Sequence, residues 1–77
     1  MSRLPRVSGK QVLAALSQAG FTVSHVRGSH YYLRREGSGG LVVVPVHGTQ
    51  IVPLGTLKSI IRQAGFSVEE FVDLLEN

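Results

Sequence analysis

The order of its apolar patterns is the feature that most restricts how this chain can fold. Apolar residues recur at helical spacing near both ends of the sequence. The segments between them either alternate apolar and polar residues or contain consecutive β-branched residues. The first helix is predicted between Ser8, which forms a capping-box spacing with Gln11, and Gly20, a common helix-ending residue. A second helix is predicted from about Thr56 to Gly65. A short third helix is expected to open at another capping box, Ser67 to Glu70.

Three segments between the helices have the composition of strands, at residues 21–26, 30–35 and 41–46. Short connections join them, Arg27-Gly28-Ser29 first and then a glycine-rich turn at 37–40, which indicates an antiparallel meander. Two amphipathic helices need a common apolar surface, and one face of such a sheet provides it. The predicted fold class is therefore α+β, in the order α-β-β-β-α, with both helices on one face of the sheet and a short extra C-terminal helix.

A chain of 77 residues has room for one small core, so we expect a single domain over residues 1–77. The sequence has no cysteine, which excludes disulfides and cysteine-based zinc sites. Its longest apolar run, at 41–46, is far shorter than the roughly 20 residues that span a membrane. The first residues, Met-Ser-Arg-Leu-Pro-Arg, lack the apolar stretch of a signal peptide. We therefore expect a soluble, cytoplasmic protein with no membrane partner.

Charge is distributed unevenly along the sequence. All eight lysine and arginine residues precede residue 66, and Glu36 is the only acid among them, so residues 1–65 carry a formal charge of +7. The last twelve residues carry four acids and no base. A basic body favours a polyanionic partner such as RNA, because each neutralised phosphate releases counterions. An ordinary solvated surface with a basic bias is the alternative.

Four segments that cover most of residues 8–65 carry a family resemblance. They are Ser8-Gly9-Lys10, Gly28-Ser29-His30, Val44-Pro45-Val46-His47, and the run from Gly55 to Gly65. In this order they resemble the HicA toxin family, also called YcfA-like proteins, which are small endoribonucleases paired with HicB antitoxins. The last segment is the most specific of the four.

The resemblance implies a fold similar to the double-stranded RNA-binding domain, which agrees with the element order obtained from the patterns. It implies the toxin of a type II toxin–antitoxin system, which cleaves mRNA and arrests translation. It also implies a HicB-like antitoxin as partner, in a toxin–antitoxin hetero-oligomer, and a catalytic histidine at His30. The sequence departs from the family at Tyr31 and Tyr32, where another histidine and an aliphatic residue are common.

The chemistry expected of a histidine here follows from the RNA itself. A base that takes the proton of the 2′-hydroxyl allows that oxygen to attack the adjacent phosphorus, and an imidazole exchanges protons near neutral pH. A strand histidine that only satisfies its neighbours is the alternative for His30. His47 is either a second acid or base or a hydrogen-bonded loop histidine. His25 continues the Phe21–Val23 face of its strand, which favours a structural role.

Strand alternation places His30, Tyr32 and Arg34 on one face and Tyr31 and Leu33 on the other. We expect the second set to face the helices. The first set would then present a base, an aromatic platform for an RNA base and a cation for phosphate. Packing at the edge of the sheet is the alternative for Tyr32.

Four further residues are predicted to bind RNA. Lys10 and Lys58 lie near the starts of two helices, where free N–H groups and the helix dipole favour anions. Arg27 and Ser29 flank the glycine of the first strand connection. Ser29 could hydrogen-bond a phosphate or hold the imidazole beside it. A solvated surface position is the alternative for each of the three cations.

Neither a metal nor any other cofactor is predicted. The three histidines are separated by five and seventeen residues, which matches no familiar ligand spacing. Two-metal nucleases need clustered carboxylates, and Glu36 is the only acid before residue 69. We therefore expect metal-independent cleavage.

Two other classes of function stay open at this point. One is a non-catalytic RNA-binding module of the same fold, and the other is a protein-interaction domain whose basic charge is incidental. The third predicted strand, at 41–46, is apolar on both faces. We expect an antitoxin or a second copy to cover its outer face, with the final helix or the N-terminus as alternatives.

Overall fold

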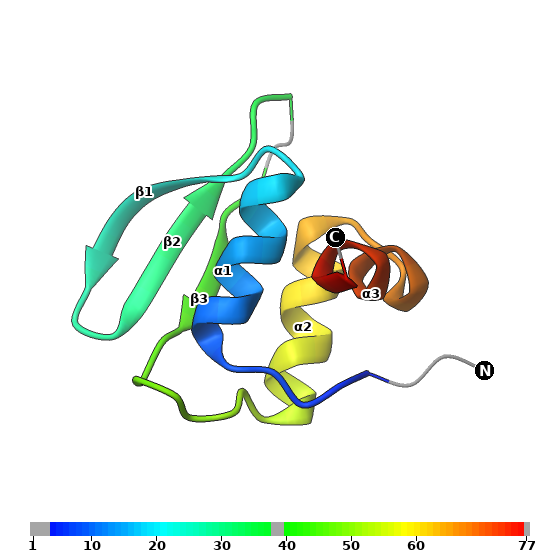
Figure 1. Cartoon of the computed structure of the whole chain (residues 1–77). Coiled ribbons are helices and arrows are strands. Elements are labelled where there is room, and N and C mark those ends of the chain that lie inside the picture. Colours follow the sequence, from blue (N-terminus) through cyan, green and yellow to red (C-terminus); the bar gives the residue numbers. More distant parts are fainter. Residues whose placement is uncertain (1–3, 38–39, 77) are drawn as a thin grey trace.

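The computed structural model describes residues 4–37 and 40–76 of the chain (Figure 1). Within them the order of elements is α1 (Gly9–Gln18), β1 (Thr22–Arg27), β2 (His30–Arg34), β3 (Val42–Pro45), α2 (Leu54–Ala64) and α3 (Val68–Glu76). Two features considered in the sequence, Arg3 and the Ser38–Gly39 part of the glycine-rich turn, lie outside the described residues.

The helix boundaries follow the predicted capping signals. The Gln11 backbone N–H donates to Ser8 Oγ at 3.3 Å, and the Ser8 backbone N–H donates to Gln11 Oε1 at 2.8 Å. The same reciprocal pair joins Ser67 and Glu70 at the start of α3, at 2.7 and 3.1 Å. Gly65 ends α2 in the left-handed conformation at φ 84°. Both capping boxes and this helix stop are confirmed.

The strands form one antiparallel sheet in the order β1-β2-β3 within the described residues. Helices α1 and α2 pack against β3, and α3 packs against both helices. Figure 1 shows α1 and α2 running in the same direction, with α1 in front of the sheet. This is the α-β-β-β-α arrangement of the double-stranded RNA-binding-domain-like fold with an added helix, as predicted.

The core lies between the helices and the half of the sheet nearest β3. Its residues share near-complete burial and apolar side chains, and the largest of them include Phe71, Leu16, Leu33, Leu57 and Ile60. Val42 and Val44 are fully buried on the helix side of β3, so this face of the strand belongs to the core as expected. Val43 points the other way and is only partly buried.

A close approach of backbones fixes α1 against the end of β3. Gly9 is buried, and a Cβ placed there would collide with the Pro45 carbonyl oxygen and lie 2.9 Å from Val46 Cα. Only glycine fits at this contact without movement of the backbone. Next to it, the Val52 N–H donates to the Val7 carbonyl at 2.8 Å. The start of α1 is therefore held at the end of the sheet where β3 finishes.

Strand β1 extends beyond the helices. All six of its residues are exposed, including Val23 at 47% and Val26 at 48%. Figure 1 shows β1 and its turn into β2 reaching past α1. The register shifts between Val23 and His25, so that the strand contains a bulge. No helix among the described residues is long and apolar enough to cross a membrane.

Candidate functional site on the open face of the sheet

The sheet has one face toward the helices and a second face, here called the open face, that carries the side chains directed away from them. Leu33 is buried and Tyr31 packs against the core, so the residues alternating with them on β2 belong to the open face. These are His30, Tyr32 and Arg34, as the sequence predicted. Their cross-strand partners lie on the same face, because opposite residues of an antiparallel pair share a side of the sheet.

Two cross-strand rows of side chains lie on the open face. Arg27, His30 and Pro45 stand opposite one another in the first row. His25, Tyr32 and Val43 form the second row. Neighbouring rows on one face are two residues apart along each strand, about 7 Å.

His30 is exposed at the start of β2, directly after the turn that contains Gly28. Gly28 has φ 59°, in the left-handed region that favours glycine, and the turn needs that conformation. Arg27 lies directly opposite His30 in the register. An imidazole and a guanidinium therefore share the end of the sheet, where both are accessible to a phosphodiester.

Ser29 is fixed from both its backbone and its side chain. Its carbonyl accepts from the Val46 N–H at 2.7 Å, which continues the pairing of β2 with β3 by one residue. Its hydroxyl shares a hydrogen bond with His47 Nε2 at 3.3 Å. His47 is thus hydrogen-bonded in its loop, beside the residue that precedes His30, and its role as an acid or base stays a prediction.

The expectation for the face of His25 is wrong. Simple alternation would have placed this histidine with Val23, but the bulge between them turns it to the open face. There its ring stacks on Tyr32, with centroids 4.3 Å apart and planes 9° from parallel. Ser24 Oγ lies 3.1 Å from His25 Nδ1 and shares a hydrogen bond with it. Tyr32 belongs to the middle strand, so the alternative of packing at a sheet edge does not describe it.

Arg34 and Arg35 are neighbours in sequence with different surroundings. Arg34 is exposed at the far end of β2 on the open face. Arg35 lies with its guanidinium carbon 4.8 Å from the ring centre of Phe21 and 5.3 Å from that of Phe66. Its Nη1 also donates to the Ala19 carbonyl at 3.5 Å. Arg35 therefore links the C-terminal end of α1 to the segment between α2 and α3, whereas the Arg34 side chain is exposed on the open face.

The two predicted lysines belong to the helical layer. Lys10 is exposed in the first turn of α1, one residue after the Gly9 contact with β3, so it borders the end of the sheet that carries His30. Lys58 is exposed on α2, which packs against β3. The register and the Gly9 contact thus place Arg27, Ser29, His30 and Lys10 near one end of the sheet, and Lys58 lies on α2.

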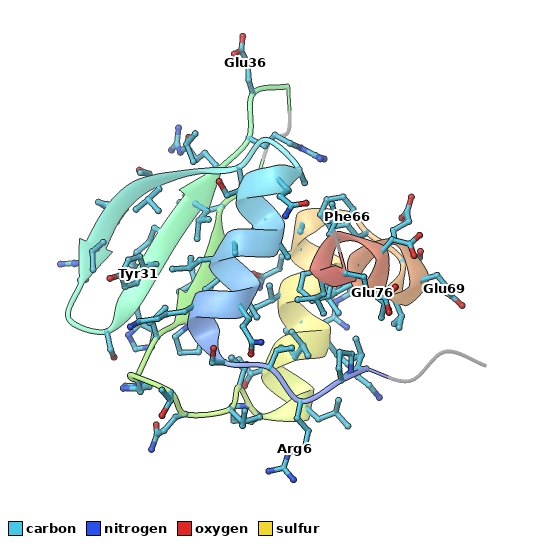
Figure 2. All side chains as sticks on the ribbon, viewed as in Figure 1. Arg6, Tyr31, Glu36, Phe66, Glu69 and Glu76 are labelled. Carbon is cyan, nitrogen blue, oxygen red and sulfur yellow. The ribbon has the colours of Figure 1, made fainter. Side chains whose placement is uncertain are left out.

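The acidic residues are concentrated away from this region. Glu69 and Glu70 occupy the first turn of α3. Figure 2 shows Glu69 and Glu76 on α3, at the other side of the molecule from β1. Among residues 4–37 and 40–76, no group of three histidine or acidic side chains is arranged to hold a metal ion. The acids of α3 therefore lie apart from Arg27 and His30, which are on the β1–β2 side of the sheet.

The fold and this face define a class of protein: a small basic α+β domain of the double-stranded RNA-binding-domain type, with a histidine exposed on its sheet. The family model described as the HicA toxin of bacterial toxin–antitoxin systems matches residues 9–66. The match covers most of the chain, and the chain therefore belongs to the HicA toxin family. No curated protein matches the chain.

His25 is the residue of the open face that the sequence did not single out. β-Bulges interrupt alternation and place a side chain on the opposite face. Nothing in the sequence Thr22-Val-Ser-His25 marks the position of a bulge, however. The pairing with β2 decides it, and that pairing is a property of the folded sheet.

Proposed function

We propose that this HicA toxin is an endoribonuclease that cleaves mRNA through acid–base catalysis by His30, without a metal ion, and so arrests translation. The observation that carries the proposal is the position of His30: exposed, at a glycine turn, and opposite Arg27 at the basic end of the sheet.

In the proposed reaction His30 takes the proton of a ribose 2′-hydroxyl. The 2′-oxygen then forms a bond to the adjacent phosphorus, and the bond from phosphorus to the 5′-oxygen breaks. The 5′-oxygen takes up a proton as it leaves, so the products are a 2′,3′-cyclic phosphate and a 5′-hydroxyl. Positive charge stabilises the extra charge that develops on the phosphate oxygens.

The remaining predicted residues are assigned to RNA binding. Arg27 and Lys10 would bind the phosphate at the sheet end, and Arg34 would bind a phosphate further along β2. Ser29 would hold the backbone of the RNA or, through His47, the loop beside the site. Tyr32 would contact a base, and Lys58 would extend the contact over the helical layer.

Membership of a toxin–antitoxin family implies pairing with an antitoxin. We propose a HicB-like protein in that role, in a hetero-oligomer in the cytoplasm. Covering the open face, where Val43 is only partly buried, would block RNA and shield apolar surface together.

The test compares the parent protein with His30→Ala and His30→Gln in cleavage of a single-stranded RNA. We expect the rate to fall about 10²- to 10⁴-fold in both variants, the usual contribution of a general base. RNA affinity and thermal unfolding should change little, because His30 is exposed. Gln63→Ala, at an exposed position of α2, is the control and should cleave as the parent does. Cleavage by His30→Ala at the parental rate would refute the proposal.

A non-catalytic RNA-binding module is the second candidate, and the helical layer supports it. Lys10 and Lys58 are both exposed near the starts of helices that run in the same direction (Figure 1). If the parent protein binds duplex RNA and leaves all RNA intact, this candidate replaces the first.

A further inference from the structure

The His25–Tyr32 pair is an ordered aromatic surface that the core does not need. His25 is exposed and Tyr32 is partly buried on the open face. Their rings are stacked at 4.3 Å and 9°. Ser24 holds His25 from a second direction through Nδ1. Two side chains that would otherwise rotate freely are thus held in one geometry at the surface.

The His25–Tyr32 pair belongs to the second cross-strand row, and the outer end of that row is one face of the His25 ring. Val43 stands on one side of Tyr32 in the register and His25 stands on the other. His25 lies on β1, an outer strand of the sheet in the described part of the chain. The outward face of the imidazole therefore continues the stack toward solvent, where a further flat ring can be added.

The bulge in β1 is what brings His25 into this row. Without the register shift between Val23 and His25, regular alternation would place the histidine on the helix side of the sheet. Tyr32 would then have no ring beside it. Bulges recur beside functional sites because they re-aim one side chain while the strand continues. Here the irregularity creates an aromatic pair in the row next to His30.

Its position relative to His30 gives the pair a function in RNA binding. The His25–Tyr32 row lies one row from the Arg27–His30 row, about 7 Å along the strands. That spacing lets a nucleotide bound by its phosphate at His30 and Arg27 reach the rings with its own or the neighbouring base. A base in a duplex is paired and stacked on both sides, so it has no face to offer.

We propose that the His25–Tyr32 pair is a stacking site for an unpaired nucleobase next to the phosphate bound at His30, and that it restricts this protein to single-stranded RNA. The inference rests on the proposed function, because it takes the RNA to be bound at His30. Aromatic stacking of this kind tolerates different bases, since each base has a flat face. The site therefore selects unpaired over paired RNA without selecting a particular base sequence.

The test measures binding of an RNA that cannot be cleaved. The probe is a 2′-O-methyl oligonucleotide of a dozen or so residues, used single-stranded and as a duplex with its complement, at one fixed salt concentration. The proteins are the parent, His25→Leu, which removes the flat ring, His25→Phe, which keeps one, and Gln63→Ala as the control on α2.

We expect the parent to bind the single strand more tightly than the duplex. His25→Leu should lose about 5- to 150-fold in affinity for the single strand, the range for one stacked base, and change little toward the duplex. His25→Phe and Gln63→Ala should bind the single strand about as the parent does. Recovery by phenylalanine separates stacking from the loss of a hydrogen bond or of charge.

Two results would overturn the inference: equal single-strand affinity in His25→Leu and the parent, or a parent that prefers the duplex. If His25→Leu fails to fold, Tyr32→Leu, which removes the other ring of the pair, carries the same comparison with the parent. The probe lacks the reacting hydroxyl, so these outcomes are independent of catalysis. Failure of the proposed function appears separately, as a parent that binds the probe but never cleaves ordinary RNA.

Discussion

The two faces of the sheet are built from the same three strands but differ in their side chains and in their burial. On the helix side, Val42, Val44 and Leu33 are almost fully buried and join the core. On the open face, the register brings together charged and aromatic side chains that remain accessible, with His30 and His25 among them. Strand β2 contributes to both faces, so a core position and a position proposed to bind RNA are neighbours in its sequence. This separation makes the two faces independently testable.

The largest effect on stability is expected at the centre of the helical layer. Phe71 on α3 is fully buried, and Phe71→Ala should cost about 3–5 kcal/mol of unfolding free energy. A domain of 77 residues has about 4–12 kcal/mol in all. Chemical denaturation should therefore show a protein near its stability limit. A loss below 1 kcal/mol would mean that α3 is dispensable to the core, contrary to its packing on α1 and α2.

A matched pair of valines tests how far the helices cover the sheet. Val44 and Val26 both stand opposite Tyr31, one on each side, at 0% and 48% exposure. Val44→Ala should cost about 2 kcal/mol, from lost burial and the cavity it leaves. Val26→Ala should cost about 0.5 kcal/mol or less. Equal losses in urea denaturation would show that β1 is covered as fully as β3.

A third comparison, with no loss of stability expected in one of its two variants, separates two adjacent arginines. Arg35→Gln should lower unfolding free energy by about 0.5–2 kcal/mol, because its guanidinium lies over Phe21 and Phe66. Arg34→Gln should leave stability unchanged and reduce the slope of log affinity against log salt by about one for RNA. The reverse assignment, with Arg35 altering the salt slope and Arg34 the stability, would contradict the division between the faces.

Much of this arrangement could be predicted from local signals. The capping boxes at Ser8 and Ser67 fixed the starts of α1 and α3, since each depends on residues only three apart. Alternation on β2 placed His30, Tyr32 and Arg34 on one face correctly, because that strand pairs without a shift against β3. Local sequence is enough to predict which face a side chain occupies where the strand or helix keeps one regular residue period throughout.

The remaining features depend on contacts between distant segments. The bulge in β1 depends on pairing with β2, so alternation put His25 on the wrong face. Helix α2 begins at Leu54, two residues before the predicted Thr56, with Pro53 as its N-cap and no side-chain cap to mark the start. The structural role of Arg35 needs Phe21 and Phe66 to meet, and they lie 45 residues apart in the sequence.

The proposed cleavage uses the 2′-hydroxyl of RNA as the nucleophile, activated by His30. The most direct measurement is the chemistry of the cleaved ends, from one RNA and from the same RNA with a 2′-hydrogen at the cleavage position, both in the presence of EDTA. We predict 2′,3′-cyclic phosphate and 5′-hydroxyl ends from the first and no cleavage at that position in the second. Ends that carry a 5′-phosphate, or cleavage of the 2′-deoxy position, would contradict it.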